Sequence, residues 1–267
     1  MKPAPLRYER PETVEEAVAL LAEHGDKAKV LAGGQSLVPA LNMRLVRPGM
    51  LVDINRVRQL DNIRAENGTL HVGAIARQAD RRLLDHALLA EALPHVGHFV
   101  TRNRGTVCGS IAHADPAAEL PVCLVLLGGS VRVVSTRSER EIPASDLFLG
   151  HFTTALDAGE LIVETIWPAA RSGWRYSFCE LSQRRGDFGL CMAAAAAGDG
   201  ELRVAVGSVT ERPQLLDVDP EQPGDSAAGQ VEPWGSLHAS PAYQRQLVRV
   251  LVDRAVGRAR GVREEFR

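Results

Sequence analysis

Two stretches of this chain carry residue types suited to holding a phosphate group. In the first, LAGGQSL, the mostly apolar residues 29–32 predict a short buried strand that Gly33 and Gly34 terminate. The apolar spacing from Leu37 to Leu41 then predicts a helix. Glycine lets other groups approach the backbone closely, and a strand that turns directly into a helix presents several unpaired N–H groups to one point. The pattern indicates an anion site, and a tight turn without a ligand is the alternative.

The second stretch runs from Thr101 to Pro121 and reads TRNRGTVCGSIAHADPAAELP. It combines glycines and small hydroxyl residues with two later carboxylates, Asp115 and Glu119. Because it has little apolar periodicity, it predicts a long loop rich in exposed backbone. Two such loops suit an elongated diphosphate ligand better than either loop alone.

These two stretches, together with a third segment near residues 178–189, resemble the FAD-binding medium subunit of the molybdenum hydroxylases. That family includes the medium subunits of carbon monoxide and nicotine dehydrogenases and the flavin domain of xanthine dehydrogenase. The resemblance covers most of residues 1–210. It implies that FAD is the cofactor.

The resemblance also implies which residues contact the FAD diphosphate. The first loop contributes a continuous run of residues: Ala32, Gly33, Gly34, Gln35, Ser36 and Leu37. The second loop matches the family pattern T-[IV]-G-G-[SN] with Thr106, Val107, Cys108, Gly109 and Ser110. Cys108 replaces the first glycine of the pair, which raises the question of how closely the backbone approaches the ligand there.

Further along, His113 and Asp115 match the family's A-H-A-D-P, and Asp115 is expected to contact the cofactor directly or through water. His113 is expected near the flavin. Glu119 stands where the family has an acidic residue that accepts hydrogen bonds from the cofactor's hydroxyls. The alternative for Glu119 is a charge that stabilises a helix N-terminus.

The third segment contains the family's R-x-G-D-[FY] as Arg184 to Phe188. The resemblance implies that Phe188 covers one face of the isoalloxazine and that Asp187 adjusts polarity near its reacting edge. Simple core packing is the alternative for Phe188. Glu180 and Ile162 are further cofactor-binding candidates by position. The chain is expected to supply no catalytic residue and no metal ligand.

Elements that would position these residues can be read from the remaining pattern. Thr13 and Glu16 form a capping box before a helix that Gly25 ends. Asn67-Gly68 between alternating residues predicts a hairpin with a type I′ turn. Further strands are expected at residues 50–54, 131–134, 140–142 and 161–167, and helices at 81–99, broken at Pro94, and at 121–127.

A domain boundary is expected near residues 169–173, which gives domains at 1–171 and 172–267. The fold class is α+β: a two-subdomain, PCMH-type FAD-binding domain, then a small domain that resembles the C-terminal domain of the carbon monoxide dehydrogenase flavoprotein. In that domain, strands at 175–181, 190–197 and 202–209 predict a three-stranded antiparallel sheet. A mobile connection at 213–241 and a closing helix at 243–260 follow. The absence of G-x-G-x-x-G argues against a Rossmann fold.

Composition narrows the class of protein further. The net charge of −2 gives no electrostatic case for nucleic-acid binding. No run approaches the ~18 apolar residues of a membrane span, and the N-terminus lacks an apolar secretory segment. The four cysteines form no C-x-x-C pair, so a zinc or iron–sulfur site in this chain is not expected. Scattered single cysteines fit a reducing cytoplasm.

The resemblance implies an electron-transfer subunit of a molybdenum-dependent hydroxylase or dehydrogenase. Partners would be a small iron–sulfur subunit and a large molybdopterin subunit, in a heterotrimer or its dimer. Electrons would pass from [2Fe–2S] clusters to FAD and then to an external acceptor. One alternative is a stand-alone FAD-dependent reductase or oxidase, and another is a scaffold that has lost its cofactor. The arginine-rich face of the last helix is either a solvated face or a docking surface for a partner.

Overall fold

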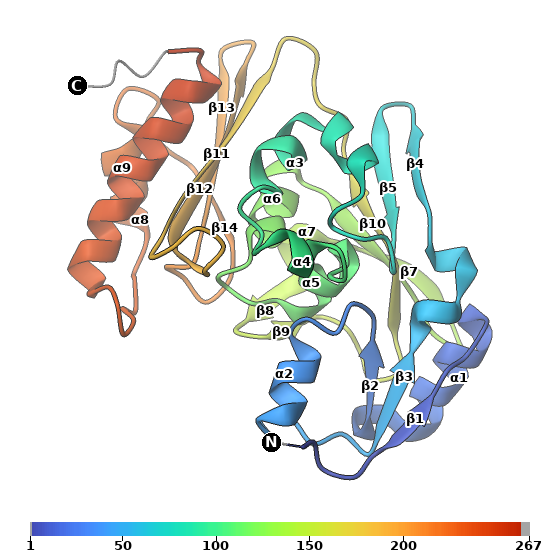
Figure 1. The fold of residues 1–267 in the computed structure, drawn as a ribbon. Helices are drawn as coiled ribbons and strands as arrows, with labels where there is room; N and C mark the ends of the chain where they lie inside the picture. Colours follow the sequence, from blue (N-terminus) through green and yellow to red (C-terminus); the bar gives the residue numbers. More distant parts are fainter. Residues whose placement is uncertain (1, 263–267) are drawn as a thin grey trace.

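A computed structural model describes residues 2–262 (Figure 1). The chain begins with a parallel three-stranded sheet in the order β1-β3-β2, made of β1 (Arg7–Glu9), β2 (Ala28–Leu31) and β3 (Met50–Asp53). Helix α1 (Val14–His24) joins the first two strands. The predicted N-cap is confirmed, since Thr13 Oγ1 accepts a hydrogen bond from Glu16 N at 3.1 Å. Gly25 ends α1 at φ 51°.

The middle of the chain forms a five-stranded sheet in the order β4-β5-β10-β6-β7. Its strands are β4 (Ile63–Glu66), β5 (Thr69–Gly73), β6 (Ser130–Val134), β7 (Glu139–Pro143) and β10 (Leu161–Trp167). The predicted type I′ turn is confirmed, because Asn67 and Gly68 both have positive φ. Strand β10 lies at the centre and unites the two hairpins through antiparallel pairing.

Short helices connect these strands and pack against the sheet. They are α2 (Leu37–Asn42), α3 (Ala87–Ala92), α4 (Phe99–Arg102), α5 (Val107–His113), α6 (Glu119–Leu127) and α7 (Ala144–Leu147). A small hairpin of β8 (Phe148–Gly150) and β9 (Thr153–Thr154) follows α7. All nine residues of α6 are buried. The helix expected over residues 81–99 is wrong in extent: a 3₁₀ turn at Arg81–Asp85 precedes α3, which ends before Pro94.

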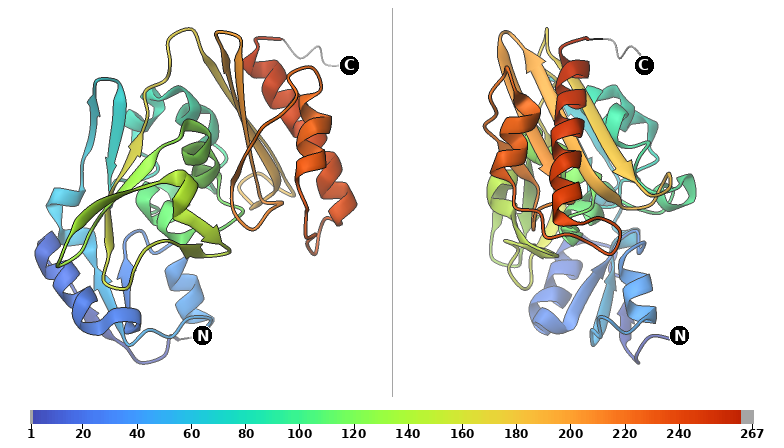
Figure 2. Two further views of the ribbon diagram at one scale, coloured as in Figure 1. Left: turned by 180° about the vertical axis from the view of Figure 1, so that it is seen from behind. Right: turned by 90° about the vertical axis from the view of Figure 1, so that its left-hand side faces the viewer.

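The C-terminal sheet has four strands rather than the expected three. Strands β11 (Arg175–Ser182), β12 (Gly189–Gly198) and β13 (Glu201–Gly207) form the predicted antiparallel meander, and β14 (Gln214–Leu216) adds an edge. The segment expected to be mobile thus contains β14 and also α8 (Pro223–Gln230), which packs against α9 (Pro241–Ala259). Figure 2 shows α8 and α9 covering one face of this sheet.

The alanine run of β12 is explained by burial on both sides. Ala193 and Ala195 lie in the core beneath α8 and α9, whereas Ala194 and Ala196 lie in the main core. Small side chains let both layers approach the strand, so tertiary packing overrides the helix propensity of alanine.

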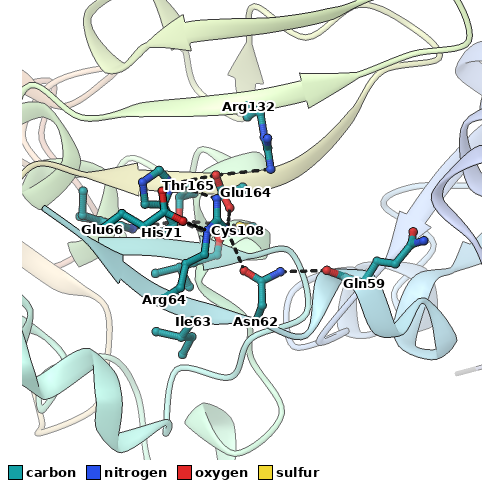
Figure 3. Close-up of polar contacts among 12 residues, drawn as sticks. Gln59, Asn62, Ile63, Arg64, Glu66, His71, Cys108, Arg132, Glu164 and Thr165 are labelled. Carbon is teal, nitrogen blue, oxygen red and sulfur yellow. Dashed lines mark hydrogen bonds and ion pairs between the residues drawn. The ribbon is translucent and has the colours of Figure 1, made fainter. Parts of the chain in front are cut away.

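A charged cluster crosses the five-stranded sheet (Figure 3). Glu164 on β10 is 2% exposed, and its carboxylate contacts Arg64, His71 and Arg132 from three other strands of the sheet. Burial alone would raise the pKa of Glu164, but its hydrogen bonds to Arg64 and His71 outweigh burial and lower it. The cluster therefore holds the strands together through a paired, buried carboxylate.

Candidate functional site

The glycine-rich loop after β2 has the geometry of an anion site. Within residues 2–262, the backbone N–H groups of Gly33, Gly34, Gln35, Ser36 and Leu37 donate to no protein acceptor. Gly34 has φ 72°, which reverses the chain before α2. These donors are half-buried or exposed, so an anionic group outside the loop can reach them.

The second stretch lies directly against this loop. A side-chain carbon added at Gly33 would lie 2.4 Å from Arg104 O and 3.0 Å from Thr106 N. At Gly109, the added carbon would lie 4.0 Å from Ala32 Cβ. The structure therefore brings the two predicted stretches together, and Gly33 is required for this close approach.

The second stretch is mostly helical, so the expectation of a long loop is wrong. Thr106 is the N-cap of α5, and its hydroxyl accepts a hydrogen bond from Gly109 N at 3.0 Å. Buried Val107, Cys108 and Ile111 form the inner face of α5. Its short length and many small residues hid this periodicity in the sequence.

Cys108 points into the core. Its thiol donates to Val72 O at 3.3 Å, and burial raises the pKa of the thiol to about 12. The cysteine side chain therefore leaves the exposed face of α5 free, where Gly109 and half-buried Ser110 lie.

Helix α5 leads from the first loop toward the predicted acidic residues, over about 10 Å for its seven residues. His113 is the last residue of α5; its ring lies 5.0 Å from that of Phe152, and burial lowers its pKa. Asp115 follows, and its Oδ1 accepts a hydrogen bond from Ala117 N at 2.9 Å. That bond fixes the turn into α6.

A buried and a half-buried carboxyl group interact beyond this turn. Glu119 is the first residue of α6 and is 6% exposed, and burial raises its pKa to about 7. Burial and the charge of Glu119 raise the pKa of Glu180, on β11, to about 8. Glu180 Oε2 is buried and has no hydrogen-bond partner within residues 2–262. The pair is thus suited to binding hydroxyl or N–H donors of a ligand.

The third predicted segment is the connection between β11 and β12. Gly186 has φ 88°, and a side-chain carbon there would lie 2.8 Å from the ring of His98. The connection therefore lies close against the residues just before α4, and Gly186 has no room for a side chain. Asp187 is exposed and Phe188 is 67% exposed, so core packing does not account for Phe188. Ile162 differs from these, because it is 4% exposed and packs in the main core.

Three polar residues near the first loop were given no role by the sequence motifs. Asp53 Oδ1 accepts from Asn55, whose Nδ2 donates to Ala32 O at 2.8 Å. Arg77 donates to Asn55 Oδ1 at 2.6 Å and to Arg104 O at 2.7 Å. Asp53 ends a parallel strand beside β2, the edge where α/β sheets commonly bind ligands, and this signal could have identified it. Asn55 and Arg77 carry no such signal.

Taken together, these groups fit an elongated, polar cofactor such as FAD. Free backbone donors lie at one end, and the carboxyls of Glu119 and Glu180 lie toward the other. Among the described residues Glu180 Oε2 has no hydrogen-bond partner, and the exposed aromatic ring of Phe188 lies on the β11–β12 connection. Figure 1 shows α4 and α5, which line this path, between the N-terminal strands and the four-stranded sheet. Within the described residues, no helix has the length and apolar character needed to span a membrane.

Comparison with known proteins agrees with this geometry. The family described as "FAD binding domain in molybdopterin dehydrogenase" matches residues 4–170. The chain is 40% identical to the 6-hydroxypseudooxynicotine dehydrogenase complex subunit alpha of Paenarthrobacter nicotinovorans, over 97% of this chain and 96% of that protein. It is 31% identical to the carbon monoxide dehydrogenase medium chain of Hydrogenophaga pseudoflava, over 97% of this chain and 98% of the relative.

The fold agrees with solved structures of such complexes. The chain superposes on a chain of carbon monoxide dehydrogenase from Hydrogenophaga pseudoflava with a TM-score of 0.93 at 30% identity, covering 98% of this chain and 99% of the other. Quinoline 2-oxidoreductase from Pseudomonas putida 86 gives a TM-score of 0.89 at 33% identity, covering 98% and 99%. The chain therefore belongs to the FAD-binding family of molybdopterin dehydrogenases, and it is an FAD-binding medium subunit of a molybdenum hydroxylase-type oxidoreductase.

Proposed function

We propose that this chain carries electrons from iron–sulfur clusters on a partner subunit, through one bound FAD, to an external acceptor. The observation that supports this most strongly is the row of free N–H donors at residues 33–37, held against α5. FAD supplies the redox chemistry, accepting and releasing one or two electrons. The chain's own residues bind and orient the cofactor.

We assign each part of FAD to a group of residues in this proposal. The FAD diphosphate is assigned to the backbone of residues 32–37 and to the exposed face of residues 106–110. The cofactor's hydroxyls are assigned to Glu119, with Asp115 beside it. The isoalloxazine is assigned to the neighbourhood of His113, Ile162, Glu180, Asp187 and Phe188. Residues 1–171 serve as the FAD-binding domain and 172–267 as the smaller domain that carries the β11–β12 connection.

The partners we propose are a small iron–sulfur subunit and a large molybdopterin subunit, in a heterotrimer or its dimer. Relatives are themselves named as medium chains or subunits of dehydrogenase complexes. The cysteines at 108, 123, 179 and 191 are all buried and unpaired, which suits a reducing cytoplasm and gives no cluster ligands here.

The arginine face of α9 is a weaker candidate for the partner contact than its sequence suggests. Arg249 pairs with Asp225, and Arg258 pairs with Glu91 at 2.6 Å. Arg260 donates to Pro220 O at 2.8 Å. These arginines fasten α9 to the rest of the chain, so their charge is already used within the subunit.

A stand-alone FAD-dependent reductase or oxidase is the alternative function. One purification distinguishes the two functions. The native protein is isolated, the co-eluting proteins are identified, and the flavin is released by heat and identified by chromatography. We expect FAD together with an iron–sulfur subunit and a molybdopterin subunit. FMN as the only flavin would contradict the diphosphate site, and FAD on a lone active chain would favour the alternative.

A further inference from the structure

The two stretches that flank the proposed diphosphate site are joined by one chain of side-chain hydrogen bonds. Asn55 Nδ2 donates to Ala32 O in the first stretch, at 2.8 Å. Arg77 donates through one guanidinium nitrogen to Asn55 Oδ1, at 2.6 Å, and through another to Arg104 O in the second stretch, at 2.7 Å. Arg77 and Asn55 together thus link the two sides of the site.

The bond to Ala32 O also sets the direction of a free donor. In a trans peptide unit, the C=O and the following N–H point in opposite directions. Because Asn55 holds the Ala32 carbonyl, the N–H of Gly33 in the same peptide is aimed away from Asn55. Gly33 N–H is one of the donors without a protein acceptor within residues 2–262.

The two stretches lie so close together that no side chain fits between them at Gly33. Gly33 lies so close to Arg104 O that an added side-chain carbon would be 2.4 Å from it. Asp53 supports the arrangement from behind, since its carboxylate accepts from Asn55 and from the hydroxyl of Tyr8. Arg77 is half-buried, and its fixed charge adds to the field that an anion meets at this loop.

We propose that Arg77 and Asn55 are positioning residues that hold the 32–37 loop against the 104–109 segment and so determine the affinity for the diphosphate of FAD. This inference rests on the proposed FAD site. Neither side chain needs to touch the cofactor: Arg77 and Asn55 act through the backbone that does. Arginine suits the role because its planar fork reaches two acceptors at once, whereas lysine has a single point charge.

The test compares Arg77→Lys, Asn55→Ala and the double variant with wild type. Equilibrium titration of flavin-free protein with FAD, and the FAD dissociation rate, are measured for each. We expect each single variant to bind FAD about tenfold more weakly or worse, the scale of one charge-assisted hydrogen bond. The double variant should bind FAD little more weakly than either single variant, because each of the three variants breaks the same chain of hydrogen bonds from Ala32 through Asn55 and Arg77 to Arg104.

Arg140→Lys is the matched control. Arg140 also donates to a backbone carbonyl, Ala155 O, and to Glu160, but it lies on β7 and touches neither stretch. Its variant should bind FAD like wild type. The reduction potential of bound flavin should stay unchanged in Arg77→Lys, since the pair acts at the diphosphate, and the flavin-free unfolding midpoints should stay within about 4 °C.

The outcomes distinguish a failure of the proposed FAD site from a failure of the positioning role of Arg77 and Asn55. Wild-type protein that binds no FAD would overturn the proposed function itself. Wild type that binds FAD while both single variants bind within about twofold of it would overturn only the positioning role. A loss of affinity matched by an equal loss of flavin-free stability in both variants would also overturn it, in favour of a purely structural bridge.

Discussion

Gly33 and Gly34 are adjacent, yet they are glycines for different reasons. Gly34 needs a positive φ, whereas Gly33 needs the absence of a side chain beside Arg104 O. Gly33 itself does not have a positive φ. We expect Gly33→Val to force the two stretches apart and abolish FAD binding while the protein stays soluble. The ratio of flavin to protein absorbance measures this, and an unchanged ratio would reduce the loop to a simple turn.

Glu119 should make the flavin-free protein less stable as pH rises. Its pKa is raised from about 4.5 unfolded to about 7 folded, so the folded state binds the proton more tightly. The associated stability is complete below the unfolded pKa and is lost as pH rises through 7. The loss is on the order of 3–4 kcal/mol, at about 1.4 kcal/mol per unit of pKa.

Urea unfolding of flavin-free wild type and Glu119→Gln between pH 5 and 8 tests this expectation. The variant has no carboxyl to ionise, so its free energy of unfolding should vary less over this range. Glu180, whose pKa is raised to about 8, should preserve part of the pH dependence of the free energy of unfolding in the variant. If the free energy of unfolding changed equally with pH in the two proteins, Glu119 would not be the group responsible.

Phe188 should matter to the flavin more than to folding. At 67% exposure it buries little apolar surface, so Phe188→Ala should change the free energy of unfolding by less than about 1 kcal/mol. The flavin potential or reactivity should shift, because the ring covers the isoalloxazine in the proposed site. Spectroelectrochemistry beside urea unfolding decides between the roles: a large stability loss at an unaltered potential would assign Phe188 to packing.

Strand β10 depends on the charges around Glu164 (Figure 3). Glu164→Ala leaves Arg64 and Arg132 without their shared carboxylate, and we expect a loss of about 3 kcal/mol in the free energy of unfolding. Glu139→Ala is the control, since that exposed glutamate also pairs with Arg132 but should contribute less than about 1 kcal/mol. Because the pKa of Glu164 is lowered, its contribution is present above the unfolded pKa of about 4.5 and is lost on acidification. Equal effects of the two variants would contradict the central role of Glu164.

Helices and strands were predicted correctly where residues close in sequence determine them, and were missed where contacts between distant residues do. The α1 cap and the Asn67-Gly68 turn are decided by neighbouring residues, and both were predicted correctly. Helix α5 was missed, because its small residues give no periodicity and its inner face is defined only by contacts such as Cys108 with Val72. Strand β14 and helix α8 lie in a segment rich in Pro, Gly and Asp, and they are ordered by packing on β13 and α9.

The site joins three parts of the chain that are distant in sequence. The loop after β2 lies against the residues that lead into α5, and the β11–β12 connection lies against His98 just before α4. Only the complete fold makes these contacts. Family motifs could mark residues in each part. The hydrogen bonds of Asn55 and Arg77, however, form only because the segment after β3 and the turn after β5 meet in the folded chain. Motif spacing therefore anticipates the candidate cofactor contacts better than the residues that hold them in place.

The proposed division of labour between subunits leads to a prediction for the isolated chain. Its cysteines are buried and unpaired, and its site residues suit holding a flavin rather than hydroxylating carbon. Alone, the flavin-loaded chain should therefore fail to oxidise N-heterocycle or aldehyde substrates. With the proposed iron–sulfur and molybdopterin subunits added, the same substrates should bleach the flavin absorbance. Anaerobic mixing of each substrate with the chain alone and with the reconstituted complex makes the comparison. Dithionite, which reduces any accessible flavin, serves as the positive control. Bleaching of the isolated chain by substrate would overturn the subunit assignment and favour a stand-alone flavoenzyme.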